Sequence, residues 1–353
     1  MKKKIIGLIL LIIVMAVIGA IYLIRVNTPE TVAVTGYVGG EKIELLEDPQ
    51  VQDIFLEKYG LEVDYSRSGS LDMMTADLSG RDYLFPSSSI ALEYYEDLHG
   101  SPVQSEIVLN TPIVLYTHQM VLDAFESQGL ITTDGDVHYI DMAGLLELIQ
   151  NNTQWSDIGL PELYGSISVD TTDPARSNSG NMFAALIANV LNGGQTLTAE
   201  DLDTILPELE NIFSRLGYME TSSSDLFSQF LRMGVGAKPV IAGYESQLIE
   251  YAALYPDEYE NIRDDVVMLY PTPTVWSAHV LIALDEDGKL LLNAMLDEDI
   301  RNLAWEKHGF RTGNYGAVSD PSALPADGVA ASVTQVTQVP SYDVMKVIIE
   351  QLE

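Results

Sequence analysis

The chain has 353 residues, 47% of them hydrophobic, and carries 52 acidic against 18 basic residues, for a formal net charge of -34. This apolar fraction can form a core, so the composition excludes a disordered acidic tail and a fibre. The charge excludes a nucleic-acid partner, because binding a polyanion depends on Lys and Arg. Without cysteine, disulfides, thiolate nucleophiles and cysteine-ligated metal sites are excluded as well.

The N-terminal segment differs from the rest of the chain. Lysines at 2–4 precede an unbroken apolar run at 5–24, and a helix of that length spans roughly 30 Å, the thickness of a bilayer's hydrocarbon core. The nearest signal-peptidase site, at 18–20, has a bulky Ile where a small residue is usual. Residues 1–25 therefore favour an uncleaved transmembrane helix over a cleaved signal sequence. The lysines predict a single-pass protein in the cell membrane, with its C-terminal domain extracellular.

From residue 31 onwards, short apolar strands alternate with amphipathic helices. Strands are expected at 31–38, 61–65, 82–85, 167–169 and 239–242, and each is followed by a helical pattern. Asp48 and Pro49 are typical of a helix start, and Gly60 of its end. Interleaved strands and helices predict an α/β fold, with a parallel sheet covered by helices on both faces.

Polar loops separate several of these strands from the helices that follow. In open α/β sheets ligands bind at the carboxyl ends of strands, and helix N-termini present unpaired N–H groups there. The candidate binding residues in these loops are Ser68, Ser70, Ser87, Ser88, Ser177, Asn178 and Ser179. Each loop taken alone is better explained as an ordinary N-cap, since Ser and Asn are preferred there. Three such loops at the same sheet edges favour a ligand cleft.

Two larger side chains complete the candidate binding set. Arg176 is one of the few basic residues and lies in a strand-to-helix loop, where its guanidinium suits an anion, although a surface ion pair explains it equally well. Tyr244 could stack on a ligand or hydrogen-bond to it, and packing is the alternative. Glu245 would repel an oxyanion if its carboxylate faced the cleft.

Signals for catalysis are weak. The five histidines lack metal-ligand spacing, and there is no G-x-S-x-G motif, Walker loop or complete dinucleotide fingerprint. The sequence therefore predicts a protein that is not an enzyme and has no catalytic residue, metal or cofactor.

Several stretches, read in order, resemble the type II periplasmic binding-protein fold, specifically the molybdate- and sulfate-type extracellular solute-binding family. They are 61–70, 81–88, Asn110-Thr111-Pro112-Ile113-Val114-Leu115 as a crossover strand, 233–244, and Ala304-Trp305-Glu306-Lys307-His308-Gly309-Phe310 as a closing helix and turn. The sequence departs from the family's pattern at the second-lobe loop, 174–180. A membrane helix also replaces the usual lipidated cysteine, and the tail beyond 310 is longer.

The resemblance implies two lobes, with residues 30–115 and 276–353 in lobe 1 and 116–275 in lobe 2. It also implies a binding module that captures a small polar ligand, such as an oxyanion, between the lobes and delivers it to a membrane permease. A surface interaction or sensory protein on the same fold, without a transport role, is the alternative. An extracellular hydrolase is the least favoured reading, for want of a nucleophile–base pair.

Overall fold

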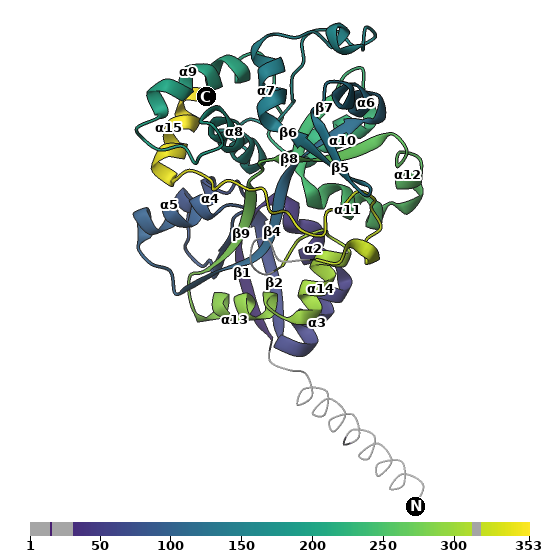
Figure 1. Ribbon diagram of the computed structural model, residues 1–353. Helices are drawn as coiled ribbons and strands as arrows, with labels where there is room; N and C mark the ends of the chain where they lie inside the picture. Colours follow the sequence, from purple (N-terminus) through teal and green to yellow (C-terminus); the bar gives the residue numbers. More distant parts are fainter. Residues whose placement is uncertain (1–14, 16–30, 313–318) are drawn as a thin grey trace, which may run out of the picture.

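The computed structural model describes residue 15 and residues 31–312 and 319–353. Within those ranges no helix is long and apolar enough to cross a membrane. Apart from Met15, the predicted membrane segment at 5–24 lies outside the described residues. The described chain folds into two lobes, one below the other in Figure 1.

Each lobe is built on one end of a shared, mixed β-sheet. The strands are β1 (Val32–Val38), β2 (Leu61–Arg67), β3 (Tyr83–Phe85), β4 (Gln104–His118), β5 (Ile131–Asp134), β6 (Val137–Asp141), β7 (Val240–Tyr244), β8 (Val266–Thr272) and β9 (Trp276–Ala283). Their order is β2-β1-β3-β9-β4-β8-β6-β5, with β7 also paired to β4. The first part of β4 pairs with β9, and its last part pairs with β7 and β8. This one long strand therefore belongs to both lobes.

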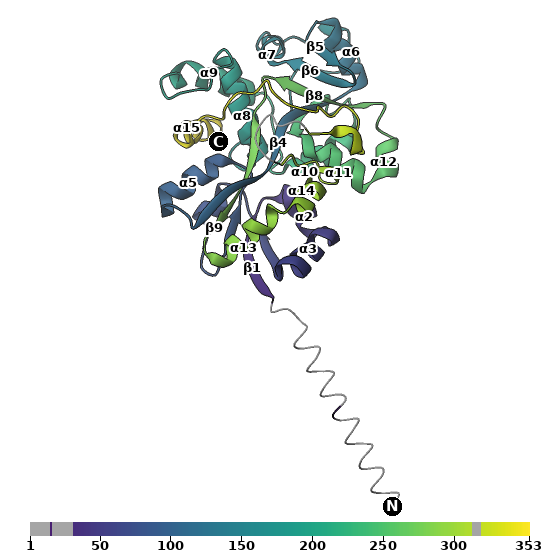
Figure 2. The ribbon, with the colours of Figure 1, turned by 60° about the horizontal axis from the view of Figure 1, so that its bottom comes forward.

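Helices cover the sheet on both sides, as Figures 1 and 2 show. In the first lobe they are α2 (Ile43–Glu47), α3 (Pro49–Tyr59), α4 (Asp72–Thr75), α5 (Ser89–His99), α13 (Glu286–Met295) and α14 (Glu298–Glu306). In the second lobe they are α6 (Gln119–Ser127), α7 (Met142–Gln150), α8 (Asn178–Leu191), α9 (Leu202–Phe213), α10 (Ser223–Met233), α11 (Glu245–Leu254) and α12 (Pro256–Glu260). The chain ends in α15 (Tyr342–Leu352).

The sequence pattern predicted the α/β class correctly but was wrong on three details. The sheet is not parallel throughout, because β9 runs antiparallel to both β3 and β4. Residues 167–169 form no regular strand; isolated bridges flank them, from Ser166 to Gln154 and from Asp170 to Ile241. The helical pattern expected after the strand at 61–65 gives only the short α4, because Ala76 takes an extended conformation.

The last helix departs from the expected placement of residues 276–353 in lobe 1. Met345 and Ile348 on α15 are fully buried in the same apolar cluster as Leu186 of α8 and Leu209 of α9. Helix α15 also contacts α5 of the first lobe. An apolar stripe at 342–349 predicts a helix but cannot identify its partner, and here that partner is mainly the second lobe. The other predicted lobe boundaries stay a prediction.

Local capping signals fixed α3 as expected. The Asp48 carboxylate accepts a hydrogen bond from the Gln50 N–H at 2.8 Å, Pro49 is the first helical residue, and Gly60 ends the helix with φ 65°. Lys307 Nζ lies 3.0 Å from the same carboxylate, and the buried His308 lies 3.4 Å away. Burial raises the pKa of Asp48, but the hydrogen bonds from Lys307 and Gln50 outweigh it, so its pKa is below the ordinary value.

This lowered pKa predicts a pH-dependent stability difference for Asp48→Asn. Asparagine also caps helices, so the substitution removes mainly the charge. Because the folded pKa is depressed, the charge stabilises the protein above the unfolded pKa, near 4, and this contribution is lost as pH falls through the folded pKa. Lys307 is partly exposed, so wild type should exceed the variant by about 1 kcal/mol at pH 7. Urea unfolding at pH 7, 5 and 3 should show the gap closing at the lowest pH; a constant gap would contradict the assignment.

Candidate functional site

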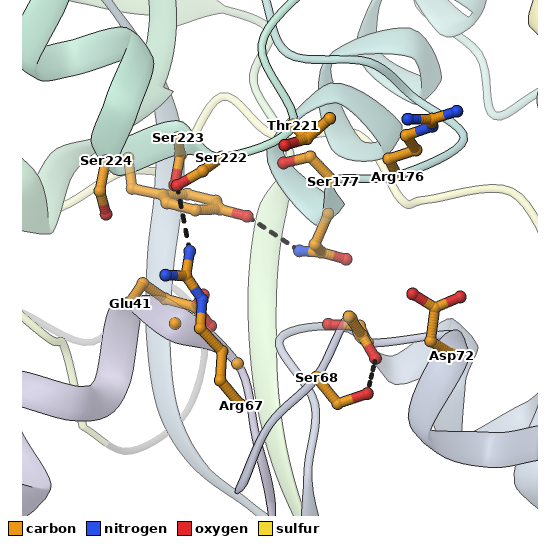
Figure 3. Close-up of a pocket in the computed structure, with 16 residues that line it drawn as sticks. Glu41, Arg67, Ser68, Asp72, Arg176, Ser177, Thr221, Ser222, Ser223 and Ser224 are labelled. Atoms are coloured by element: carbon orange, nitrogen blue, oxygen red, sulfur yellow. Dashed lines mark hydrogen bonds between the residues drawn. The ribbon is translucent and has the colours of Figure 1, made fainter. Parts of the chain in front are cut away.

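A polar cavity of about 400 Å³ lies where the two lobes meet. The first lobe lines it with the turn after β1, the end of β2 and the start of α4, and the second lobe with the starts of α8 and α10 and the end of β7 (Figure 3). The lining residues are Gly39, Gly40, Glu41, Arg67, Ser68, Gly69, Ser70, Asp72, Arg176, Ser177, Asn178, Thr221, Ser222, Ser223, Ser224 and Tyr244. Loops far apart in the sequence therefore meet at one cavity.

The structure brings most of the predicted site residues to this cavity. Those that line it are Ser68, Ser70, Arg176, Ser177, Asn178 and Tyr244. The first two come from one lobe and the other four from the other lobe. The sequence therefore placed residues on both walls of one cavity, although it could not show how the loops face each other.

Three predicted residues lie behind the walls rather than on them. Ser88 caps α5, its hydroxyl accepting a hydrogen bond from the Ile90 N–H at 3.1 Å, as an ordinary N-cap would. Ser87 is fully buried, and its N–H donates to the Ser70 hydroxyl at 3.0 Å. Ser179 is buried, and its hydroxyl lies 2.7 Å from that of Thr172. These side chains hold the loops in place.

Two sets of hydrogen bonds already join the walls. Asn178 Nδ2, at the start of α8, lies within 2.9 Å of the Ser87 carbonyl oxygen, 3.0 Å of the Tyr244 hydroxyl and 3.2 Å of the Ser277 hydroxyl. Arg67 Nη2 donates to the Ser222 hydroxyl at 3.2 Å from the opposite side. Figure 3 shows the guanidinium of Arg67 reaching across the cavity to Ser222. The lobes are therefore close together in this structure.

The starts of α8 and α10 supply further donors. Neither N-cap, Ser177 or Ser222, makes a side-chain capping bond. The first N–H groups of an α-helix have no partner within the helix, so these groups are available beside the cavity. Gly180 lets the first turn of α8 pack closely, since a Cβ atom there would lie 2.1 Å from the Thr172 carbonyl oxygen. Any larger residue would push this helix start away.

The acidic residue Glu41 at the edge of the cavity is neutralised from beneath. Its carboxylate accepts hydrogen bonds from Lys42 Nζ and the Ser87 hydroxyl. Lys42 is fully buried, and His279 Nδ1 lies 3.2 Å from its Nζ. Burial lowers the pKa of Lys42, although Glu41 opposes this, and burial together with Lys42 lowers the pKa of His279 well below its usual value. The imidazole is therefore neutral, and Lys42 pairs with Glu41 on the side of the carboxylate away from solvent.

Tyr244 forms part of the wall with a neutral hydroxyl. Its side chain is almost fully buried, and burial raises the pKa of its phenol. The neighbouring Glu245 does not face the cavity as an opposing charge. It is fully buried and pairs with Arg311, whose Nε lies 2.6 Å from its carboxylate. Glu245 would therefore not repel an anion in the cavity.

Arg176 is placed differently from what the sequence suggested. It borders the cavity, but its side chain is 71% exposed, and its guanidinium points away from Ser177 and Arg67 in Figure 3. Its Nε lies 3.6 Å from the Asp173 carboxylate. Arg176 therefore forms a surface ion pair, the alternative to anion binding that the sequence left open. The guanidinium that reaches across the cavity is that of Arg67.

Arg176→Ala should therefore have little effect on the folded protein. An exposed ion pair stabilises by no more than about 1 kcal/mol and commonly by less, so the expected change in unfolding free energy is below about 0.5 kcal/mol. Urea unfolding of the variant and the wild type checks this. A loss above 2 kcal/mol would give Arg176 a structural role that its contacts do not show.

Sequence reasoning missed several lining residues. Arg67 lies in the same Ser-rich loop as Ser68 and Ser70, yet the guanidinium of Arg176 was chosen instead. Four hydroxyl residues lie together at the start of α10: Thr221, Ser222, Ser223 and Ser224. The other loops were found as polar residues between an apolar strand and a helix, and no apolar strand precedes this run. The carboxylates of Glu41 and Asp72 carried no local signal.

In the part of the chain that the structure describes, no three His, Asp or Glu side chains are grouped so that they could hold a metal ion. The residues that line the cavity are mainly hydroxyl, amide and guanidinium donors. Such an arrangement can bind a polar, anionic group by hydrogen bonds.

Comparison with known proteins supports the same class of fold. No protein-family model matches the chain, and no curated protein sequence matches it. Solved structures do match over nearly the whole length. A protein of Bordetella parapertussis assigned to the extracellular solute-binding proteins superposes with a TM-score of 0.60 at 12% identity, covering 90% of this chain and 97% of its own.

Two further structures give similar agreement. The substrate-binding protein of an ABC transporter from Agrobacterium tumefaciens has a TM-score of 0.56 at 12% identity, over 92% of this chain and 94% of its own. The sulfate-binding protein from Mycobacterium tuberculosis has a TM-score of 0.54 at 14% identity, over 90% and 96%. All three carry the names of binding proteins. The chain therefore has the type II fold of periplasmic and extracellular solute-binding proteins, as the sequence resemblance predicted.

Proposed function

We propose that this protein is a membrane-anchored, extracellular solute-binding protein that captures a small polar ligand between its lobes and presents it to a transport permease. The observation that carries the proposal is the 400 Å³ cavity with polar residues from both lobes. Ligand pockets of small-molecule binding proteins range from about 300 to 1,000 Å³. A ligand that contacts both walls favours the closed arrangement over an open one, and that is how hinge-closing proteins report occupancy.

The chemistry of the walls favours a ligand with an anionic group. Arg67 supplies a guanidinium, and the serines at 68, 70, 177 and 222–224 supply hydroxyls. One structural neighbour is named for sulfate binding, which makes an oxyanion a reasonable first candidate here. The anchor at 1–25 and the lobe boundaries near 115 and 275 belong to the same proposal.

A thermal-shift screen of the extracellular part against oxyanions, amino acids and sugars tests the proposal. A ligand present at 100 times its dissociation constant should add about 2.7 kcal/mol of stability. The proposal predicts stabilisation by at least one small polar compound, and the variants Ser70→Ala and Asn178→Ala, on opposite walls, should both weaken it. If no compound stabilises the wild type, or if both variants bind as the wild type does, the function is wrong.

One observation favours the alternative of a sensory or surface interaction protein. Helix α15 joins the lobes on a further side: the Tyr342 ring stacks on Tyr94 of α5 at 4.5 Å between centroids, and Gln351 donates to Glu210 of α9 at 2.7 Å. A helix fixed to both lobes restricts the opening that a transport cycle needs. Small-angle scattering with and without a ligand separates the two. A decrease in radius of gyration favours transport, and an unchanged radius favours the alternative.

A further inference from the structure

Two opposite charges in the cavity have no ionic partner. Among the described residues, no carboxylate lies within ion-pairing distance of Arg67, whose guanidinium donates only to the neutral Ser222 hydroxyl. The carboxylate of Asp72, an exposed residue, likewise has neither an ion pair nor a hydrogen bond within the part of the chain that is described. Figure 3 shows the two groups on opposite sides of the cavity. The other charged groups at the cavity, Glu41 and Arg176, are already paired.

Beyond Asp72 the cavity continues into a small extension between the start of α4 and α8. Its volume is about 20 Å³, enough for one group the size of a water molecule. Asp72, Asn181 and Arg176 line it, and the guanidinium of Arg176 is exposed and pairs with Asp173. Asn181 is only 4% exposed, and its amide has no hydrogen-bond partner among the described residues. Although the residue is buried, the nitrogen and oxygen of this amide are not enclosed by protein, so both are open to a group that enters the extension.

The extension suits a group that donates hydrogen bonds and carries positive charge. A primary ammonium has three donors and no acceptor. The Asp72 carboxylate and the Asn181 amide oxygen can both accept from it. A bare oxyanion would satisfy Arg67 and leave Asp72 as an unpaired and repulsive charge. The lining therefore matches a ligand that carries both charges.

We propose, on the basis of the function proposed above, that the ligand is a small zwitterion. Its anionic group, a carboxylate or a phosphoryl group, binds Arg67 and the hydroxyls at 222–224. Its ammonium group enters the extension and binds Asp72 and Asn181. This assignment follows from the positions of the unpaired groups and sets the ligand apart from a simple inorganic anion.

Matched pairs of probes isolate the ammonium group. Calorimetric titration compares 2-aminoethyl phosphate with ethyl phosphate, and β-alanine with propionate. In at least one pair, the compound with the amine should bind about tenfold or more tightly than its partner without it. A hydrogen bond to a charged group contributes roughly that much affinity. The pair that shows the preference identifies the anionic group. Equal binding within both pairs, or no binding by either amine, overturns the zwitterion.

Variants locate the ammonium group in the cavity. Asp72→Asn and Asn181→Leu should each remove the preference for the amine while the affinity for its deaminated partner stays the same or rises. The control is Asp53→Asn, an exposed carboxylate on α3 outside the cavity, which should keep the full preference. A preference that survives Asp72→Asn overturns the assignment.

The outcomes separate this inference from the function itself. If sulfate or ethyl phosphate binds as tightly as the amines and Arg67→Gln weakens that binding, the cavity is a ligand site and only the zwitterion is wrong. If no probe and no compound of the wider screen binds, the proposed function fails together with it.

Discussion

Glu245→Gln should lower the free energy of unfolding by about 3–5 kcal/mol, the cost of leaving a buried charge without its partner. The Glu245 carboxylate is fully buried, and it accepts hydrogen bonds from Arg311 Nε at 2.6 Å and Nη2 at 2.7 Å. The Tyr270 hydroxyl donates to the same carboxylate. Burial lowers the pKa of Arg311, but Glu245 outweighs it and raises that pKa above its usual value. The variant removes the charge of Glu245, but the guanidinium would stay charged, because an arginine side chain does not lose its proton in a protein.

Urea unfolding of the variant measures this loss. Glu306→Gln, an exposed glutamate on α14, is the control and should change stability by less than about 0.5 kcal/mol. The double variant Glu245→Gln with Arg311→Met should recover much of the loss, because it removes the unpaired charge as well. If Glu245→Gln is no worse than Glu306→Gln, the pair does not hold α11 to the segment after α14.

Arg67→Gln should weaken the binding of an anionic or zwitterionic ligand by about tenfold to a hundredfold. A hydrogen bond between charged groups contributes about 1.5–3 kcal/mol, and each 1.4 kcal/mol is a factor of ten in affinity. The melting temperature of the ligand-free protein should hardly change, because Arg67 is exposed and donates to Ser222 alone among the described residues.

Arg176→Gln is the matched control for this experiment. Both arginines lie in Ser-rich loops that border the cavity, but the side chain of Arg176 faces solvent and pairs with Asp173. Calorimetric titration with the same ligand should show at most a small effect for this control. A larger loss of affinity with Arg176→Gln than with Arg67→Gln would mean that Arg176 is the cation that binds the ligand, as the sequence predicted.

The comparison of these two arginines shows what sequence could and could not establish. Strand-to-helix loops rich in serine are a local signal, and it led to loops that meet at the cavity. The direction of each side chain depends on tertiary packing, so the sequence could not choose between Arg67 and Arg176. For the same reason Ser88, a serine in a strand-to-helix loop, was predicted as a binding residue although its hydroxyl caps α5.

The fold was predictable where local chemistry decides. Asp48, Pro49 and Gly60 set the ends of α3 as the capping rules require. Long-range pairing was not predictable, and β9 shows why. Its residues are all buried in the structure, yet nothing in their sequence shows that they insert between β3 and β4 and run antiparallel to both. The partner of α15 was hidden for the same reason.

Hydrogen exchange, measured by mass spectrometry with and without a ligand from the thermal screen, tests most directly whether the cavity between the lobes is the binding site. The account predicts slower exchange in loops on both walls, at 66–72 in the first lobe and at 176–180 and 221–226 in the second. The face around 336–339, which borders a separate cavity, should be unchanged. Protection confined to one wall, or found only at 336–339, would contradict a ligand held between the lobes.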